Sequence, residues 1–434
     1  MSATNFLTIE PIRGPLRARA RVPGSKSLTN RVLVASALAD RRTTLTGALI
    51  ADDSRHMAGA LAALGIGVTI HAEQCRMVID GALGRIPARA AELRVGNSGT
   101  TARFLTAVLT LGDGEYVIDG EPRMRERPIG GLVDALVQLG ATIECSSGCP
   151  PVRIVARGLR GGRARVSGAV SSQFLSAILL AAPCARTPVE VVVEGELRSK
   201  PYVDMTVATL ASFGIEVARV GFDRFRVNPG PYRSPGTYQV EADASAASYL
   251  FAAAAIVGGS VRVEGLTRRS LQGDIRFVDI LSAMGCRVRD GDTWTEVCRE
   301  GALRGVDVDL GDMPDVAQTL AAVAPFAESP TTIRGIASAR LKECDRIAAS
   351  AEALARLGVT VSERPDGLVI EPCARLRPAV VPTRDDHRMA MAFALVGLGT
   401  PGVTIENPGC VSKTFPGYFA ALDRLREPCL DCCQ

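Results

Sequence analysis

The sequence predicts an α/β protein with two similar domains, each made of three copies of one small unit. A helical pattern followed by a short β-branched run recurs six times along the chain. The copies lie about seventy residues apart, a longer period than that of common solenoid repeats. Prolines and glycines cluster at residues 229–236, after the third copy, and predict a domain boundary near residue 240. Two similar domains also predict a ligand site in the cleft between them.

Glycines at the ends of helices define the period. They are Gly65, Gly140, Gly214, Gly285 and Gly358, separated by 75, 74, 71 and 73 residues. Glycine suits the position after a helix because it adopts positive φ without steric cost. A sixth, weaker copy has Arg426 in place of the glycine. In chain order, these helices are expected at residues 53–64, 127–139, 200–213, 273–284, 345–357 and 414–425.

A second, apolar helix is expected in every copy, so each copy combines two helices with several strands. These helices are expected at residues 32–38, 101–109, 174–182, 244–256, 316–326 and 388–396. Strands are expected after the glycines, at residues 68–70, 141–143, 215–217, 287–288 and 359–361, and between helices, as at residues 189–193 and 261–263.

Composition excludes several classes of protein. The chain has 434 residues, of which 47% are hydrophobic and 22% charged, as in ordinary globular proteins. A net charge of +4 and 4% aromatic residues give no reason to expect nucleic-acid or membrane binding. No signal peptide is evident, and the most apolar stretch, residues 246–258, is too short to cross a bilayer.

The cysteines indicate a reducing compartment. Twelve cysteines without a pairing pattern, in a chain with large cores, predict reduced thiols and a cytoplasmic protein. Cys429, Cys432 and Cys433 form one C-terminal cluster, but it lacks the four ligands of a structural zinc site. We therefore interpret this segment as a tail and predict no metal site.

Three of the apolar helices begin with residues suited to binding anions. Residues 23–31 contain Lys26, Ser27 and Arg31, but they lack the glycine pattern of a P-loop, which we exclude. Residues 96–103 and 171–173 occupy the equivalent positions in the next two copies. Backbone N–H groups at helix starts attract anions. The alternative interpretation is three ordinary N-caps.

Arginine-rich segments precede other helices. Arg123, Arg125 and Arg127 lie within five positions, and arginine forks bind phosphate and carboxylate in a bidentate manner. These residues are therefore either an anion clamp or a solvated loop. Residues 340–346 repeat the theme: Lys342 and Arg346 would share a face if the segment is helical, with Glu343 between them.

The remaining polar residues allow a bland interpretation as well. Further basic groups occur at residues 385–390 and 412–416. His387, His56 and His71 are expected to be structural more often than catalytic. Asp315 follows Pro314 and opens an apolar helix, where its ordinary interpretation is an N-cap.

Eight motifs occur in the order found in one family. The chain resembles the EPSP synthases (3-phosphoshikimate 1-carboxyvinyltransferases), enolpyruvyl transferases, from about Phe6 to Leu425. The motifs lie at residues 23–27, 96–100, 121–128, 171–174, 273–276, 342–346, 386–390 and 413–416.

This resemblance implies the enolpyruvyl transferase fold: six βαβαββ repeats arranged as two pseudo-threefold domains, an inside-out α/β barrel. Residues 1–23 and 241–434 would form one domain and residues 24–240 the other, with the active site in the interdomain cleft. The implied reaction transfers the enolpyruvyl group of phosphoenolpyruvate to the 5-hydroxyl of 3-phosphoshikimate through a tetrahedral intermediate, and releases phosphate. It belongs to chorismate and aromatic amino acid biosynthesis and requires no cofactor or metal.

The resemblance also assigns site residues. Those implied for 3-phosphoshikimate are Lys26, Ser27, Arg31, Ser171, Ser172, Gln173, Ser199, Tyr202, Asp315, Ser338 and Lys342. Those implied for phosphoenolpyruvate are Lys26, Gly99, Arg127, Arg346, Arg388 and Lys413. The implied catalytic residues are Asp315 as the base for the 5-hydroxyl, Glu343 for the C3 proton, and Lys26, which would contact both ligands.

Three positions depart from the family pattern. Ser338 stands where many relatives have Asn, which weakens one predicted phosphate contact. Ser98 and Phe104 replace the Ala and Pro of one branch beside the phosphoenolpyruvate pocket, so sensitivity to the inhibitor glyphosate is an open question. The resemblance also leads us to expect a monomer.

Two alternatives remain. UDP-N-acetylglucosamine enolpyruvyl transferases share the fold and the donor, but they typically carry a reactive Cys in the loop that corresponds to residues 121–128, which has none here. A non-catalytic scaffold that binds anions would not explain Asp315 and Glu343 among the basic motifs.

Overall fold

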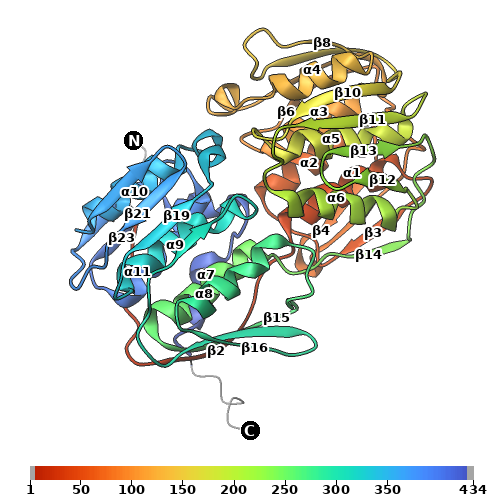
Figure 1. Cartoon of the computed structure of the whole chain (residues 1–434). Helices are drawn as coiled ribbons and strands as arrows, with labels where there is room; N and C mark the ends of the chain where they lie inside the picture. Colours follow the sequence, from red (N-terminus) through yellow and green to blue (C-terminus); the bar gives the residue numbers. More distant parts are fainter. Residues whose placement is uncertain (1–4, 428–434) are drawn as a thin grey trace. The chain divides into compact units, whose positions relative to one another are not determined.

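The computed structural model describes residues 5–427 of the chain. The chain folds into two compact units. The inserted unit is Gly24–Val240, and the terminal unit combines the residues up to Pro23 with those from Glu241 onward. In Figure 1, the inserted unit runs from red to yellow-green, and most of the terminal unit runs from green to blue. Each unit contains three sheets and six α-helices within the described residues.

The α-helices alternate along the chain between the two kinds expected from the sequence. Those of the inserted unit are α1 (Lys26–Leu38), α2 (Asp52–Ala63), α3 (Gly99–Leu109), α4 (Gly130–Gln138), α5 (Ser172–Ala181) and α6 (Lys200–Ser212). Those of the terminal unit are α7 (Ala244–Val257), α8 (Phe277–Ala283), α9 (Ala317–Val323), α10 (Arg346–Arg356), α11 (His387–Gly399) and α12 (Tyr418–Arg424).

The strands of the inserted unit form three four-stranded sheets. In sheet order they are β14 (Thr237–Gln239), β3 (Thr43–Thr46), β5 (Arg76–Ile79) and β4 (Val68–His71); β6 (Ala90–Arg94), β7 (Asp113–Asp119), β9 (Val152–Arg157) and β8 (Thr142–Glu144); and β10 (Gly162–Ser167), β11 (Val189–Glu194), β13 (Arg224–Val227) and β12 (Val217–Val220).

The terminal unit has two four-stranded sheets and one of three strands. In sheet order they are β16 (Arg287–Asp290), β17 (Trp294–Arg299), β15 (Gly259–Glu264) and β2 (Leu16–Arg21); β18 (Asp307–Asp309), β19 (Thr331–Arg334), β21 (Gly367–Ile370) and β20 (Val361–Arg364); and β1 (Phe6–Thr8), β23 (Val403–Glu406) and β22 (Ala379–Val381).

All six sheets are built around the same parallel pair. In one sheet, β6 pairs in parallel with β7, β7 pairs antiparallel with β9, and β9 pairs antiparallel with β8. The other four-stranded sheets repeat this order of one parallel and two antiparallel pairings. The six copies found in the sequence are therefore six sheets with their helices.

The sixth sheet explains why the last copy is weak in the sequence. Strand β22 pairs in parallel with β23, as in every other sheet, but the antiparallel neighbour of β23 is β1 from the start of the chain. Phe6 lies opposite Glu406 in this pairing. A strand from the N-terminal end thus takes the place that a following hairpin takes in the other copies.

Two strands complete sheets far from them in sequence. Strand β2, before Pro23, pairs with β15 of the terminal unit, with Arg19 opposite Arg262. Strand β14, before Glu241, pairs with β3 of the inserted unit, with Tyr238 opposite Leu45. Each of the two chain crossings between the units is therefore flanked by a strand held in the unit that the chain is leaving.

Six helices form the centres of the two cores. Nearly every residue of α1, α3, α5, α7, α9 and α11 is buried, which suits helices that are apolar all round. Helix α3 packs against α5, and α11 packs against α9 and α7. The second helices expected from the sequence are confirmed, although α1 begins six residues before the expected position 32.

The glycine prediction is also confirmed. Gly65, Gly140, Gly214, Gly285 and Gly358 have φ between 77° and 109°, and each lies just beyond a helix. Among the helices expected before these glycines and in the weaker sixth copy, three start clearly later than expected. Helix α4 begins only at Gly130, the segment before α8 is the 3-10 helix η4 (Gly273–Arg276), and α12 begins only at Tyr418.

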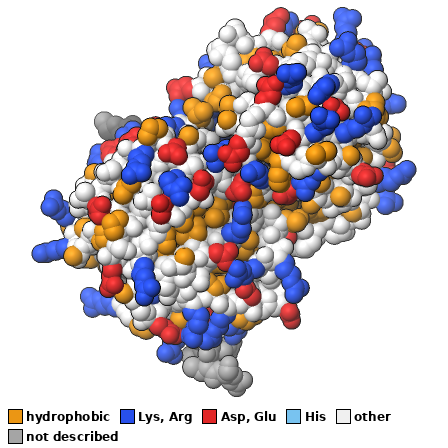
Figure 2. Space-filling model, viewed as in Figure 1, with side chains coloured by type: hydrophobic (Ala, Val, Ile, Leu, Met, Phe, Trp, Pro, Cys, Tyr) orange, Lys and Arg blue, Asp and Glu red, His pale blue; other side chains and the backbone are white. Residues whose placement is uncertain are grey.

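The surface carries charges of both signs. Lys and Arg side chains are interspersed with Asp and Glu over the face shown in Figure 2, in keeping with the small net charge. Among the described residues, no helix is both long and apolar enough to cross a membrane.

Candidate active site

Three buried helices of the inserted unit begin with serine caps. The side chains of Ser25, Ser98 and Ser171 each accept a hydrogen bond from a backbone N–H in the first turn of α1, α3 or α5. None of these first turns contains an acidic residue, so no carboxylate there offsets the positive end of the helix dipole. The N-cap interpretation is thus correct, and the helix starts remain suited to anions.

These three helix starts lie side by side within the unit. Asn30 Nδ2 donates to Thr100 Oγ1 over 2.8 Å and joins α1 to α3. Arg31 Nη2 donates to Ser176 Oγ over 3.3 Å and joins α1 to α5. The segments at residues 23–31, 96–103 and 171–173 therefore converge, as the sequence predicted.

Arg31 lies beneath two of the expected ligand residues. Its side chain donates to Thr206 Oγ1, to the carbonyl of Ser27 and to the carbonyl of Tyr202 over 2.8, 2.8 and 2.9 Å. Its Cζ lies 5.2 Å from the centre of the Phe104 ring. Arg31 is 1% exposed, and this burial lowers the pKa of its guanidinium to about 10, although Tyr202 raises it. Arg31 thus fixes Ser27 and Tyr202 from within the core.

Gly99 allows two guanidinium groups to approach the start of α3. A Cβ at Gly99 would lie 2.5 Å from Arg127 Nη2 and 2.5 Å from Arg103 Nη1. Arg127 Nη1 donates to the backbone and side-chain oxygens of Asn97, both over 2.9 Å, and the side chain is buried. The structure thus brings Gly99 and Arg127 together.

The arginine-rich loop divides between the two interpretations. Arg123 pairs with Glu126 over 2.7 Å and Arg125 with Asp119 over 2.5 Å, and each pair has one exposed partner. Only Arg127, after the 3-10 helix η2 (Met124–Glu126), points inward. The solvated-loop interpretation is therefore supported for Arg123 and Arg125, while Arg127 is buried beside Asn97.

The other expected residues of this unit lie at helix starts. Lys26 opens α1, and its Nζ lies 3.7 Å from Asp53 Oδ2. Ser171 and Ser172 are at the start of α5, and Ser199 precedes α6 with φ of 57°. The buried Oε1 of Gln173 has no hydrogen-bond partner within the described chain. A buried amide oxygen without a donor is suited to a hydroxyl from a ligand.

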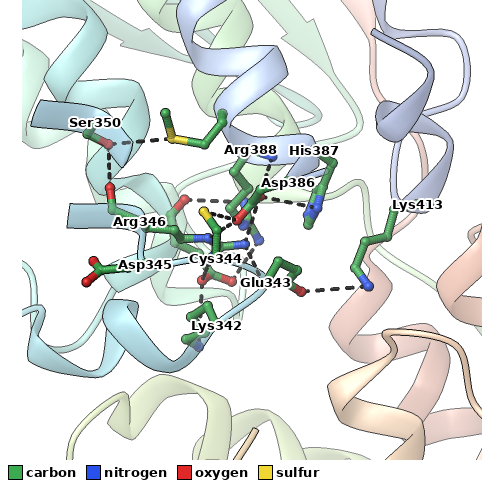
Figure 3. A network of polar contacts seen from close by, with 12 residues as sticks. Lys342, Glu343, Cys344, Asp345, Arg346, Ser350, Asp386, His387, Arg388 and Lys413 are labelled. Atoms are coloured by element: carbon green, nitrogen blue, oxygen red, sulfur yellow. Dashed lines mark hydrogen bonds and ion pairs between the residues drawn. The ribbon is translucent and has the colours of Figure 1, made fainter. Parts of the chain in front are cut away.

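Arg346 is the centre of the charged cluster in the terminal unit, shown in Figure 3. Its guanidinium donates to Asp386 through Nε and Nη2 over 2.7 and 3.2 Å, to Glu343 over 2.7 Å and to Asp315 over 3.2 Å. Arg346 is 2% exposed. Burial lowers its pKa, but the charges of Asp386, Glu343 and Asp315 outweigh burial and raise the pKa overall.

Arg388 makes the second strong contact with Asp315. Its Nη2 donates to Asp315 Oδ2 over 2.7 Å, and its Nη1 lies 3.3 Å from Tyr249 Oη. Burial raises the pKa of Tyr249 to about 12, although Arg388 lowers it. Asp315 lies in the 3-10 helix η5 (Pro314–Val316), and neither η5 nor α9 has a side-chain cap. The N-cap interpretation of Asp315 is therefore wrong.

Two lysines complete the cluster. Lys342 Nζ lies 3.9 Å from Asp315 Oδ1, and Lys413 Nζ lies 3.7 Å from Glu343 Oε1. Lys342 precedes α10, so it does not share a helical face with Arg346, yet both reach Asp315. Ser338 lies nearby in sequence, partly exposed, in the 3-10 helix η7 (Ala337–Leu341).

Sequence reasoning missed several partners of these residues. They are Asp386, Asp53, Asn97, Tyr249 and Asp274. Asp386 was visible as an N-cap pattern, because its side chain accepts from the N–H of Arg388 at the start of α11. Its pairing with Arg346 depends on a contact across 40 residues.

Two further predictions concern the histidines and metal binding. His387 is fully buried beside Asp386, with Nδ1 3.6 Å from Oδ1, which favours the structural interpretation. Between residues 5 and 427, no group of three or more His, Cys, Asp or Glu side chains is arranged to hold a metal. The cluster of Cys429, Cys432 and Cys433 lies outside the described residues.

Comparisons with known proteins give the cluster a context. The family model for EPSP synthase (3-phosphoshikimate 1-carboxyvinyltransferase) matches residues 11–422. The 3-phosphoshikimate 1-carboxyvinyltransferase of Nostoc punctiforme is 47% identical over 97% of this chain and 99% of its own length. That of Thiobacillus denitrificans is 51% identical over 94% of this chain and 97% of its own.

Solved structures agree. The EPSP synthase of Acinetobacter baumannii has a TM-score of 0.80 at 27% identity, with 98% of each chain covered. The enolpyruvyl transferase NikO of Streptomyces tendae has a TM-score of 0.79 at 18% identity, with 98% of each chain covered, and this likeness shows the fold alone.

Proposed function

The chain belongs to the EPSP synthase (3-phosphoshikimate 1-carboxyvinyltransferase) family, and from this premise we propose how its residues carry out the reaction. The enzyme transfers the enolpyruvyl group of phosphoenolpyruvate to the 5-hydroxyl of 3-phosphoshikimate. The hydroxyl oxygen bonds to C2 of phosphoenolpyruvate while C3 gains a proton. The tetrahedral intermediate then loses a proton from C3 together with phosphate, which yields 5-enolpyruvylshikimate 3-phosphate.

The paired charges around Arg346 carry the residue assignment. Arg346 and Arg388 share the carboxylate of Asp315, and Glu343 lies between Arg346 and Lys413. We propose that phosphoenolpyruvate, itself an anion, takes Arg346 and Arg388 over from Asp315. Asp315 is then available to accept the proton of the 5-hydroxyl, and Glu343 to exchange the proton at C3. Arginines already held in place stabilise developing charge without reorganisation.

The inserted unit supplies the second set of residues. We assign Ser27, Arg31, Ser171, Ser172, Gln173, Ser199 and Tyr202 to 3-phosphoshikimate, together with Lys342 and Ser338 of the terminal unit. Gly99 and Arg127 join Arg346, Arg388 and Lys413 on phosphoenolpyruvate, and Lys26 contacts both ligands. The starts of α1, α3 and α5 support this assignment. Their first turns contain no acidic residue, so the positive ends of these helices suit ligands that carry several negative charges.

Both sets must serve one reaction, so we propose that the units close when the ligands bind. Small-angle scattering should show compaction with both ligands present. An unchanged radius of gyration would remove this proposal. The same measurement reports whether the enzyme is a monomer, as we propose. A cytoplasmic location is supported by the described cysteines, all of which are free thiols.

Glyphosate is the inhibitor that we propose for the phosphoenolpyruvate set. Ser98 caps α3 directly before Gly99, and the buried Phe104 lies under Arg31. A titration of phosphate release with glyphosate against phosphoenolpyruvate tests this. Competition with phosphoenolpyruvate is expected, and the inhibition constant sets the sensitivity of this chain.

The decisive experiment is phosphate release from phosphoenolpyruvate with either acceptor. Release is expected with 3-phosphoshikimate and not with UDP-N-acetylglucosamine. Asp315→Ala and Glu343→Ala should each lower kcat by about two to four powers of ten. Near-normal turnover in both variants would remove the assignment of these two carboxylates.

A further inference from the structure

Two cysteines of the inserted unit lie in one tight turn that the reaction does not use. Cys145 and Cys149 are in the loop between β8 and β9. Gly148 N donates to the carbonyl of Cys145 over 3.4 Å, and Cys145 Sγ donates to the carbonyl of Cys149 over 3.2 Å. Both thiols are free and partly exposed. The thiol of Cys145 thus already contacts the backbone of Cys149.

The two thiols are also close enough to interact electrostatically. Burial raises the pKa of Cys145, and the neighbouring Cys149 raises it further. Burial raises the pKa of Cys149, and Arg103 lowers it. Both groups are therefore largely protonated thiols at neutral pH.

This turn holds the start of helix α4. The carbonyl of Gly148 accepts from the N–H groups of Ile129 and Gly130 over 2.8 and 2.9 Å. A Cβ at Gly130 would lie 3.3 Å from Gly148 Cα, so the two backbones are in close contact. The carbonyl of Gly148 thereby satisfies N–H groups that no helical carbonyl can reach.

The same helix start carries a residue of the phosphoenolpyruvate set. Arg127 lies two residues before Ile129, and Arg103 Nη2 donates to the carbonyl of Pro128 over 2.9 Å. The turn, the first N–H groups of α4 and Arg127 therefore form one short chain of covalent and hydrogen bonds. A change in the conformation of the turn is therefore transmitted to Arg127 along these bonds and does not require the hydrophobic core to rearrange.

We propose that Cys145 and Cys149 are a dithiol that small disulfides such as oxidised glutathione close reversibly, and that closure displaces Arg127. One cysteine thiolate attacks a sulfur of the oxidant and releases one thiol. The second thiolate attacks the mixed disulfide and releases the other. Two electrons pass from the cysteines to the oxidant, and the cysteine protons end on the released thiols.

Closure must disturb the turn. A disulfide fixes the sulfurs about 2.05 Å apart and sets a narrow range of Cβ positions. Cys145 can then no longer donate to the carbonyl of Cys149. Gly148, which lies between the cysteines, carries the carbonyl that accepts from Ile129 and from Gly130, the first residue of α4. The effect on catalysis rests on the proposed function, in which Arg127 binds phosphoenolpyruvate.

The test compares the full-length enzyme after dithiothreitol and after oxidised glutathione. Peptide mapping of alkylated protein should show a Cys145–Cys149 disulfide in the oxidised sample. The KM for phosphoenolpyruvate should rise by about tenfold, as for a small misplacement of a binding group. The KM for 3-phosphoshikimate should stay nearly constant, and dithiothreitol should restore the first value.

Matched variants separate this pair from the other cysteines. Cys145→Ser and Cys149→Ser should each keep the basal activity and lose the response to oxidised glutathione. Cys75→Ser removes an exposed lone thiol and should leave the response intact. A response retained in Cys145→Ser and Cys149→Ser would assign the effect to other thiols and overturn the proposal.

The disulfide and its effect on the KM for phosphoenolpyruvate are tested by separate measurements. Mixed disulfides alone at Cys145 and Cys149 would overturn the dithiol. A disulfide with an unchanged KM for phosphoenolpyruvate would overturn the link to Arg127. Absence of turnover in the reduced enzyme would count against the proposed function and leave the peptide map to decide on the disulfide.

Discussion

Arg346 and Asp386 are joined by two hydrogen bonds, from Nε to Oδ2 over 2.7 Å and from Nη2 to Oδ1 over 3.2 Å, with both side chains removed from solvent. The same carboxylate caps helix α11. Asp386 therefore orients the guanidinium that we assign to phosphoenolpyruvate and fixes the helix that carries Arg388. The pair links the fold of the terminal unit directly to its chemistry.

Removing the charge of Asp386 should harm both stability and substrate binding. Asp386→Asn keeps an oxygen that can cap α11 but leaves Arg346 without its principal counter-charge. Breaking a buried ion pair on one side costs about 3 to 5 kcal/mol, so urea unfolding should show a loss of this order. The KM for phosphoenolpyruvate should rise as well. An unchanged stability would show that Glu343 and Asp315 suffice for Arg346.

Asp345→Asn is the matched control. Asp345 caps α10 and pairs with Arg340, but its side chain is 40% exposed. Exposed pairs contribute about 0 to 1 kcal/mol, and asparagine retains the cap. This variant should unfold within about 1 kcal/mol of the parent chain. A large loss here would show that an exposed carboxylate at a helix start matters as much as the buried one, and it would contradict the argument from burial.

A methyl group at Gly99 should act on one ligand only. Gly99→Ala places a Cβ 2.5 Å from Arg127 Nη2 and Arg103 Nη1, so both guanidinium groups must move. We expect the KM for phosphoenolpyruvate to rise by about tenfold or more, because binding groups must be held to within a fraction of an ångström. Steady-state kinetics with each substrate varied separately measures this.

Gly59→Ala controls for the loss of a helical glycine. A Cβ at Gly59, in α2, meets nothing within 4 Å. Alanine should leave both KM values unchanged and stabilise the helix by about 0.5 to 1 kcal/mol. Equal effects of the two substitutions on phosphoenolpyruvate would contradict the steric argument for Gly99.

Asp274 should make stability depend on pH in an unusual direction. Burial raises the pKa of this carboxyl from 3.8 to about 6, the charge of Asp315 adds to this, and the hydrogen bond from Ser245 opposes it. An acid whose pKa is higher in the folded state favours folding below its unfolded pKa. That contribution, about 3 kcal/mol for a shift of this size, is lost as the pH rises from 3.8 through about 6.

Asp274→Asn removes this titration. The gain in stability of the variant over the parent chain should be larger at pH 8 than at pH 5, because about half of the contribution of Asp274 is already lost at pH 5 and all of it at pH 8. Thermal unfolding at both values measures the effect. A stability difference that does not change between pH 5 and pH 8 would show that Asp274 is not the titrating group.

Arg31→Lys should destabilise the core of the inserted unit. Lysine cannot reproduce the hydrogen bonds from Arg31 to Thr206, Ser27, Tyr202 and Ser176. Each buried acceptor left without a donor costs about 1 to 3 kcal/mol, so unfolding should require clearly less urea. The KM for 3-phosphoshikimate should rise because Ser27 and Tyr202 lose their support. An unaffected KM would show that Arg31 has a structural role only.

Much of the fold is encoded locally. The apolar period of α3 and the glycine after α2 depend on neighbouring residues, so the sequence alone predicts the six copies. The same holds for helix starts furnished with Ser98 or Ser171. Propensity, capping and periodicity are properties of short stretches, and they are largely independent of the rest of the chain.

The tertiary structure decided what depends on distant contacts. The pairings of β1 with β23, β2 with β15 and β14 with β3 join residues up to about 400 positions apart, and no local pattern specifies them. The sequence by itself determined which residues carry charge at the ends of elements. Only the fold decided that Arg127 turns inward while Arg123 and Arg125 form partly exposed ion pairs, and that Asp386 holds Arg346. The physical reason is that the interaction energy of a charged group depends on its burial and on its partners, and only the folded chain sets both.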